Sequence, residues 1–346
     1  NDKAFSTDGP KLAIMPRGRY VATLLIALAI AAALSITYLA WIEPGDKSPP
    51  PQYEISQKEG QTVATNLLTG RIEHESGSAS EVLQAVFRSL PDGGTVLVRS
   101  GEYELDESVE LSGNTILRGE GIQNTVFTSE NKGMLVVKDR SGVTLSDFRL
   151  VGSTAIYITA DQTDVSGLLV RNVEATVTKD MGGAFTLAPN GRTISEVSFI
   201  DCHAMDGEAY GFLNIGSRGD SLVRNITYTN CTAVDNGLSS RSHDWTVGFD
   251  LAEMTDVDRM LLVNCTANNN WESGFHFEDD IESRHIVFEN CVANGNGRNK
   301  PDPLYGAGFV LNGDTVLRNC TADENAKANL LVFGNPRTVA VEGGDL

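Results

Sequence analysis

A short motif that recurs through the second half of the chain limits its possible folds more than any other feature. Each copy is an apolar stretch followed by Asn or Asp, then Cys in most copies, then one residue and Ala, as in NCTA. Successive members of the Asn/Asp column are 29, 29, 34, 26 and 29 residues apart, and the column consists of Asn172, Asp201, Asn230, Asn264, Asn290 and Asn319. Such regular steps predict that one structural unit is repeated.

A second apolar motif, with Gly-Phe in most copies, occurs once in each interval. Its copies occupy 155–158, 184–187, 211–214, 248–251, 274–277, 308–311 and 329–332. The steps of 26 to 34 residues in the Asn/Asp column are too short for the hairpin pairs of a β-sandwich, and no helical periodicity fills the intervals. We therefore predict an all-β fold, a parallel β-helix in which each repeat forms one coil about 4.8 Å above the last.

Stacked coils bring the members of each column together. We expect the column asparagines to point inward and to form ladders of amide hydrogen bonds at the turns. Every cysteine lies in the adjoining column, which consists of Cys202, Cys231, Cys265, Cys291 and Cys320. An extracellular location would permit disulfides, but the odd number and the parallel side-chain directions favour free, buried thiols that pack as small apolar groups.

The N-terminal segment predicts a membrane anchor. Residues 20–42 carry no charge, and 23 residues at about 1.5 Å each can span a hydrocarbon core of about 30 Å. Basic residues precede this segment, so the positive-inside rule assigns 1–19 to the cytoplasm and places the chain beyond residue 42 outside the cell. A cleaved signal peptide is the alternative, although the apolar stretch is long for one.

The remaining chain predicts a spacer and one exported domain. Residues 43–60 form a Pro-rich stalk, because three consecutive prolines favour an extended, semi-rigid chain. We assign 61–346 to the extracellular domain. Glu81–Leu90 has an amphipathic pattern with a capping box that begins at Ser78, so a helix is expected to cover the first coil and protect its edge strands.

The segment SEVLQAVFRSLPDGGTVLVRSGEYELDESVELSGNTILRGEG, 80–121, resembles the opening of the pectate lyase and polygalacturonase superfamily. The later NCTAxxN…GF coils resemble the repeats of β-helix surface proteins common in archaea and bacteria. The resemblance covers roughly 61–346 and implies a right-handed, single-stranded parallel β-helix with an N-terminal capping helix. It implies no single activity, because this scaffold carries many.

Two adjacent coils carry the chemically suggestive departure from the repeat. Aligning Gly248 with Gly274 places Asp250 beside His276. The other coils carry uncharged residues at the same outward position, namely Tyr157, Thr186, Leu213, Val310 and Leu331. Because outward side chains of neighbouring coils stand next to one another, this pair is the candidate catalytic centre.

The segment VGFDLAEMT is similar to the Tyr-Gly-Phe-Asp-Pro-His-Glu-Gln-Thr segment of alginate epimerases. The likeness carries over Asp250 and Glu253, whereas Val247 replaces the tyrosine and Ala252 replaces the catalytic histidine. His276 from the next coil could supply a base. If the protein is an enzyme, a polysaccharide lyase or epimerase is therefore favoured.

A hydrolase is disfavoured. Asp279-Asp280 resembles the paired aspartates of polygalacturonases, but the Gly-His-Gly and RxK motifs of that family are missing. Calcium is the expected cofactor, if there is one, because Glu278, Asp279 and Asp280 offer hard oxygen ligands. Trp245 and Trp271, with Glu253, are candidates for contacts to sugar rings. The alternative is that these acids form a solvated face in which His276 pairs with Asp250.

Composition excludes one class of partner. The formal net charge of −19 argues against nucleic acid, whose phosphates need Lys and Arg. We therefore expect a single-pass cell-membrane protein whose extracellular β-helix binds, and in one hypothesis modifies, a polysaccharide or surface glycan. The alternative is a non-catalytic structural or interaction component of the envelope or of a membrane complex, with other envelope proteins as partners.

Overall fold

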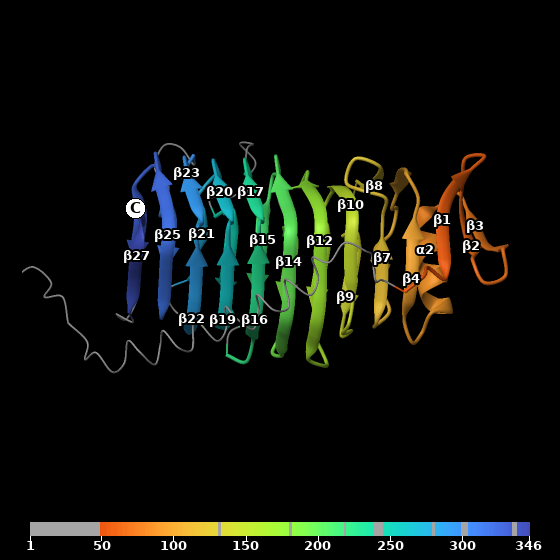
Figure 1. Ribbon diagram of the computed structural model, residues 1–346, viewed down its shortest axis with the longest axis horizontal. Coiled ribbons are helices and arrows are strands. Elements are labelled where there is room, and N and C mark those ends of the chain that lie inside the picture. Colours follow the sequence, from red (N-terminus) through yellow and green to blue (C-terminus); the bar gives the residue numbers. More distant parts are fainter. Residues whose placement is uncertain are drawn as a thin grey trace, which may run out of the picture. The chain divides into compact units, whose positions relative to one another are not determined.

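The computed structural model describes residues 49–130, 133–179, 182–217, 219–237, 245–278, 281–298, 304–333 and 338–346. The predicted cytoplasmic tail and membrane anchor, 1–42, lie outside these residues. Within the described ranges no helix is long and apolar enough to cross a membrane. From Pro50 onward the chain forms one compact unit, and this unit contains the predicted β-helix (Figure 1).

The unit is built from two sheets that the chain visits alternately, so that the coils stack along one axis (Figure 1). Sheet A contains β1 (Tyr53–Lys58), β2 (Gln61–Asn66), β3 (Arg71–Ser76), β4 (Gly94–Val98), β5 (Gly101–Glu104), β7 (Thr115–Arg118), β8 (Thr125–Ser129), β10 (Thr144–Gly152), β12 (Val165–Val177), β14 (Thr193–Met205), β16 (Leu222–Thr229), β17 (Thr232–Val234), β19 (Asp256–Val263), β20 (Thr266–Asn268), β22 (Ser283–Glu289), β23 (Val292–Asn294), β25 (Thr315–Asp323) and β27 (Val339–Asp345). Sheet B contains β6 (Val109–Glu110), β9 (Leu135–Lys138), β11 (Ile156–Thr159), β13 (Gly183–Ala188), β15 (Tyr210–Ile215), β18 (Phe249–Glu253), β21 (Phe275–His276), β24 (Ala307–Leu311) and β26 (Ala328–Val332). The strand pairs of sheet B are all parallel, which confirms the predicted parallel β-helix.

The Gly-Phe motif fills the interior. On the inner face of sheet B, the ring centroids of Phe212 and Phe249 lie 4.4 Å apart, and those of Phe249 and Phe275 lie 4.8 Å apart. Phe185 and Phe309 extend the stack at 4.7 and 5.1 Å. Stacked rings at one coil spacing bury large apolar surfaces, so the residues on either side of each phenylalanine must face outward.

The Asn/Asp column lies at the bend in sheet A, for example between β16 and β17. Its six members have φ between 49° and 54°, a left-handed conformation that Asn and Asp tolerate better than other residues with a Cβ. The predicted ladder is present, since the Nδ2 of Asn264 donates to the Oδ1 of Asn230 at 3.2 Å and that of Asn290 donates to Asn264 at 3.3 Å. The expected inward direction is wrong, because the left-handed residue turns its side chain to the outer surface, where Asn264 and Asn290 are exposed.

A second, inward ladder lies at the next bend. It is formed by the final asparagine of the NCTAxxN motif, namely Asn236, Asn270, Asn296 and Asn325. Each Nδ2 donates to the Oδ1 of the next member at 3.0 Å. Asn270 has no exposed surface. Because every donor and acceptor on the Asn270 amide has a partner, burying this polar side chain at the bend leaves no unsatisfied hydrogen-bonding group.

The cysteine column faces the interior, as predicted, and all five thiols are free and buried. The Sγ of Cys231 donates to the carbonyl of Phe199 at 3.4 Å, and that of Cys265 donates to Tyr228 at 3.5 Å. Burial raises the pKa of both thiols well above the ordinary value. The column therefore consists of packing groups without thiolate character.

The N-terminal end is closed as expected by α2 (Ala79–Ser89), which contacts β2, β3, β5 and β6. The Oγ of Ser78 accepts a hydrogen bond from the backbone N–H of Glu81 at 3.2 Å, as a helix N-cap should. The domain begins earlier than predicted. β1 starts at Tyr53, inside the segment 43–60 assigned to the stalk, because Tyr53 and Ile55 alternate into the core and the strand pairs with β2.

Candidate functional site

The structure brings together the two residues predicted to form the catalytic pair. In sheet B, Asp250 on β18 is the partner of His276 on β21. The same register runs through the other coils at Tyr157, Thr186, Leu213, Val310 and Leu331. Since Phe249 and Phe275 face the interior, Asp250 and His276 face the outside of the sheet, as the alignment predicted.

This part of the outer face is nevertheless closed to solvent. Asp250 and His276 are each 2% exposed, and their neighbours Leu213 and Val310 are 3% and 0% exposed. The ring of Tyr305 meets the imidazole of His276 edge-on, with centroids 4.7 Å apart. The ring of Phe333 is 5.5 Å from that of Tyr305 and nearly parallel to it. The two aromatic rings therefore cover His276.

A buried carboxylate holds this cover in place. Glu272 is 0% exposed, and its Oε1 accepts hydrogen bonds from the backbone N–H groups of Tyr305 at 2.6 Å and Gly306 at 3.2 Å. Its Oε2 accepts from the hydroxyl of Ser273. A buried carboxylate is stable only with such donors, so Glu272 fixes the backbone of Tyr305 and Gly306 and acts as a latch on these two residues.

Three buried polar atoms of the central pair lack hydrogen-bond partners among the described residues, although the Asp250 carboxyl also has a hydrogen bond from the backbone N–H of Ala252. Neither the Oδ1 of Asp250 nor either ring nitrogen of His276 forms a hydrogen bond. The nearest carboxylate oxygen to the imidazole is Oε1 of Glu278, at 3.8 Å from Nε2, which is too far for a hydrogen bond. The hypothesis that His276 simply pairs with Asp250 on a solvated face is therefore wrong, because the groups are buried and no hydrogen bond joins them.

Burial sets the protonation state of both groups. Loss of solvation, followed by the negative charges of Glu253 and Glu278, raises the pKa of Asp250 well above its ordinary value. Loss of solvation lowers the pKa of His276 to about 3. In the folded protein these shifts favour the protonated carboxyl of Asp250 and the neutral imidazole of His276. Such a pair can exchange hydrogen bonds with hydroxyl groups, but it contains no strong base.

Of the other predicted site residues, Glu253 and Glu278 lie near this pair. A β-bulge opposite Asn214 shifts the register of β18, so that Glu253 pairs with Ile215. Glu253 lies close enough to Asp250 for its negative charge to raise the pKa of Asp250. Trp245 is 51% exposed, whereas Trp271 is half-buried and its Nε1 has no hydrogen-bond partner in the part of the chain that the structure describes.

The proposed calcium ligands are described only in part. Glu278 lies beside His276, with Oε1 3.8 Å from Nε2, whereas Asp279 and Asp280 lie outside the described residues. Within the described part of the chain, no three His, Cys, Asp or Glu side chains are grouped so that they could hold a metal. The proposed metal site therefore stays a prediction.

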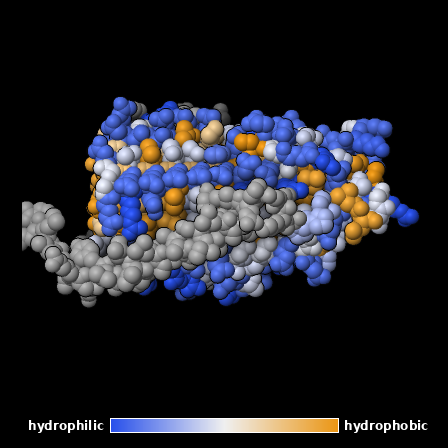
Figure 2. Space-filling model, viewed as in Figure 1, coloured by the Kyte–Doolittle hydropathy of each residue, from blue (hydrophilic) through white to orange (hydrophobic). Residues whose placement is uncertain are grey.

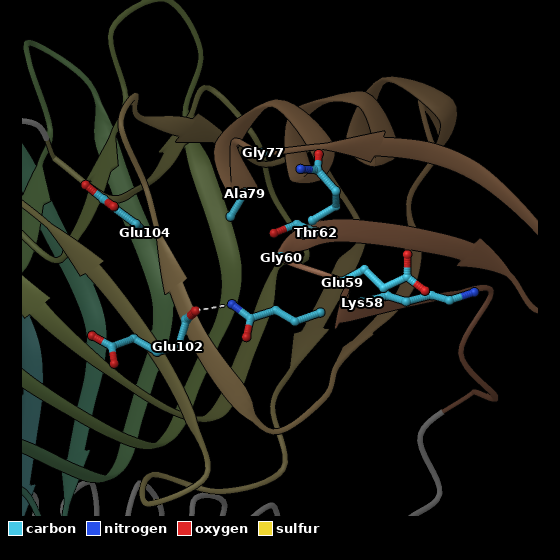
Figure 3. A pocket seen from close by; sticks show the side chains of 10 residues that line it. Lys58, Glu59, Gly60, Thr62, Gly77, Ala79, Glu102 and Glu104 are labelled. Carbon is cyan, nitrogen blue, oxygen red and sulfur yellow. Dashed lines mark hydrogen bonds between the residues drawn. The ribbon is translucent and has the colours of Figure 1, made fainter.

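Two cavities that the sequence did not predict lie near the N-terminal end. One, of ≈ 470 Å³, is bordered by β1, β2 and β5 (Figure 3). The other, of ≈ 550 Å³, lies between β5 and Lys179. Both are lined by Glu102 and Glu104, which share one face of β5, and Gln57 donates a hydrogen bond to the carbonyl of Glu102. Neither cavity contains a predicted site residue, and a cluster of carboxylates alone does not identify a ligand.

Comparison with known proteins gives the same fold. A family model described as a right handed beta helix region matches residues 154–346. No curated protein matches the chain significantly.

Several solved structures resemble the chain at low identity. The A-module of the Azotobacter vinelandii mannuronan C-5 epimerase AlgE4 is 12% identical over 78% of this chain and 91% of its own, with a TM-score of 0.37. Pectate lyase Pel9A is 12% identical over 71% and 70%, with a TM-score of 0.37. The tailspike protein gp49 of Acinetobacter baumannii bacteriophage Fri1, a capsular polysaccharide depolymerase, is 13% identical over 78% and 60%, with a TM-score of 0.43. These similarities concern the fold and indicate no activity.

Proposed function

This chain belongs to the right-handed β-helix family, whose model matches more than half of its residues, and we propose that it binds carbohydrate on the outer face of sheet B. The binding centre is the pair Asp250 and His276. The protein is anchored in the cell membrane by residues 20–42 and presents the β-helix outside the cell. Its ligand is a polysaccharide or surface glycan.

The observation that carries this proposal is that three buried atoms of the pair, the Oδ1 of Asp250 and both ring nitrogens of His276, have no hydrogen-bond partner among the described residues. A buried polar atom without a hydrogen bond costs about 1–3 kcal/mol, and the coils before and after carry Leu213 and Val310 at the same position. An aliphatic pair would therefore be the more stable choice here. Sugar hydroxyls could supply the missing partners, accepting from the carboxylic acid of Asp250 and donating to a ring nitrogen of His276.

Binding is favoured over catalysis by the protonation states. A lyase or epimerase must remove a proton next to a carboxylate, and a histidine whose pKa is about 3 is a weak base for this step. The raised pKa of Asp250 favours its protonated form, which cannot accept a further proton. In addition, Ala252 occupies the position of the catalytic histidine in alginate epimerases.

Binding requires the cover to open. Tyr305 lies directly on the imidazole of His276, so a glycan must displace this ring to reach the pair. The displaced ring, together with the exposed Trp245, could then stack on sugar faces, since aromatic rings present an apolar face and Tyr also a polar edge. Calcium, held by Glu278, Asp279 and Asp280, could bridge this acidic region to an anionic glycan.

The test is retention of the full chain on a broad glycan array, with and without calcium. We expect retention without product, and a loss of about tenfold or more in affinity for Asp250→Asn and Trp245→Ala, which corresponds to about 1.4 kcal/mol. Val341→Ala is the matched control for Trp245→Ala, because Val341 on β27 is 50% exposed and Trp245 is 51% exposed. Unsaturated uronate ends or a changed epimer ratio, abolished in Asp250→Asn, would show instead that the protein is an enzyme.

One observation favours the alternative of an envelope scaffold without a site. Asp250 and His276 are closed off, and neither lines either of the two cavities. If no glycan on the array is retained, and Asp250→Leu leaves every property except stability unchanged, the scaffold is the better interpretation. Its partners would then be other envelope proteins.

A further inference from the structure

The turn between β2 and β3 exposes a cluster of large apolar side chains. Leu68 is 82% exposed, and Leu67 and Ile72 are 41% and 45% exposed. Hydrophobic residues gather at the end of the molecule that β1, β2 and β3 form (Figure 2). Monomeric soluble domains seldom keep such clusters unless they contact another apolar phase. We name residues 67–72 the apolar tip.

The apolar tip has a fixed conformation. The Oδ1 of Asn66 accepts hydrogen bonds from the backbone N–H groups of Leu68 at 2.9 Å and Thr69 at 3.2 Å. The N–H of Gly70 donates to the carbonyl of Asn66 at 2.8 Å, and Gly70 has a φ of 68°. This turn requires a positive φ at that residue, which glycine provides. The leucines are therefore held outward by the backbone.

The apolar tip is joined to the point where the chain enters the domain. The N–H of Leu67 donates to the carbonyl of Gln52 at 2.8 Å. Nine residues lie between Gln52 and Ile42, the last residue of the predicted anchor. A chain of that length reaches about 35 Å at most, since a fully extended chain spans no more than about 3.6 Å per residue. If residues 20–42 are held in a membrane, Gln52 therefore lies no farther than that from it.

The charge of the apolar tip suits a lipid headgroup region. From Asn66 to Ile72 the one charged residue is Arg71, which is exposed, although the whole chain carries a net charge of −19. Leucines flanked by a basic residue match an interface where acyl chains lie beneath phosphates.

From these four observations we propose that the apolar tip inserts into the headgroup layer of the bilayer that anchors the chain. This inference rests on the membrane anchor of the proposed function and extends it. A second contact beside the anchor would hold the first coil at the membrane and fix the direction in which the β-helix extends.

The experiment uses the full chain in phosphatidylcholine–phosphatidylglycerol vesicles, at no more than one chain per vesicle. A fluorophore is attached at Thr69→Cys, beside the leucines, or at Val332→Cys near the other end, where Val332 is 48% exposed. The native cysteines do not interfere, because all five are buried. Flotation reports anchoring, and collisional quenching by iodide reports the exposure of the label.

We expect the floated Thr69→Cys label to be quenched about tenfold less than the Val332→Cys label, since burial of one leucine is worth at least that factor. The protection should vanish when Leu67→Ser and Leu68→Ser are added. Equal quenching of the two labels in floated vesicles, or protection that survives the serine substitutions, would overturn the inference and leave the anchor intact. Failure of the chain to float would overturn both the anchor and the inference, without bearing on glycan binding.

Discussion

Replacing Asp250 by Asn should change how the stability of the β-helix depends on pH. Burial, and after it the negative charges of Glu253 and Glu278, raise the pKa of Asp250 well above the ordinary value. The folded protein therefore keeps a proton at pH values where the unfolded chain has lost it. Its contribution to the free energy of unfolding then falls by about 1.4 kcal/mol for each pH unit above about 3.9, until Asp250 ionises in the folded protein. Asparagine cannot ionise and lacks this dependence.

His276 contributes the opposite dependence. Its pKa is lowered from 6.5 to about 3, so between these values the unfolded chain binds the extra proton. Stability from this group therefore rises with pH across that window, by about 5 kcal/mol in total. From about pH 4 to 6.5 the contributions of Asp250 and His276 oppose each other in the wild type. In Asp250→Asn only the pH dependence from His276 remains, and in His276→Asn only that from Asp250 remains.

The assay is urea denaturation of the full chain in detergent and EDTA, at about pH 4.5, 5.5 and 6.5, followed by far-UV circular dichroism. The informative quantity is the difference between each variant and the wild type. It should rise by about 1.4 kcal/mol per pH unit for Asp250→Asn and fall by the same amount for His276→Asn. The double variant should lack both dependences. If the free energies of unfolding of Asp250→Asn and the wild type differ by the same amount at all three pH values, Asp250 is ionised in the folded protein and the reasoning is refuted.

Three further predictions concern groups that the fold has buried. Asn270→Ala removes four hydrogen bonds from the inner ladder and should lower the free energy of unfolding by about 3–5 kcal/mol. The exposed Asn264→Ala should lower it by about 1 kcal/mol or less. Equal losses for the two variants in urea denaturation would contradict this. Glu272→Ala should lower it by about 2–4 kcal/mol and speed hydrogen exchange at Tyr305 and Gly306, whereas unchanged exchange there would show that the carboxylate is no latch. The five thiols should resist Ellman's reagent until the chain unfolds, because all are buried; rapid labelling of even one would contradict the packing.

The repeated features of the fold were predictable from the sequence. Because coils stack at one spacing, the alignment of Gly248 with Gly274 was enough to pair Asp250 with His276. α2 was likewise predictable, since its capping residue and amphipathic pattern are local signals.

The cover over His276 could not be predicted from the repeat. Tyr305 and Phe333 come from segments between the repeated strands, and nothing in the periodicity indicates where those segments fold back. One signal was present: Glu272 introduces a carboxylate where the preceding coil has Thr246 and the following one has Gly306. An acid at an otherwise uncharged position next to the interior indicates a specific set of donors.

The direction of the Asn/Asp column was mispredicted because backbone conformation was not considered. Asparagine suits both an inward ladder and a left-handed bend, and the motif NCTAxxN contains one of each. Asn230 takes the bend and Asn236 the ladder. The strand β1 was missed because the preceding prolines masked a short alternating pattern.

The inner ladder also constrains how such a protein can change its length. Its donors all point the same way along the axis, and successive members are 34, 26 and 29 residues apart in sequence yet 3.0 Å apart at their amides. Insertions in the connecting loops are therefore absorbed without disturbing the ladder, whereas a coil lacking its asparagine would leave amides on both sides unmatched. Evolution can thus lengthen the outer loops residue by residue. It can lengthen the stack of coils only by duplicating whole coils that carry the asparagine amide in the same orientation.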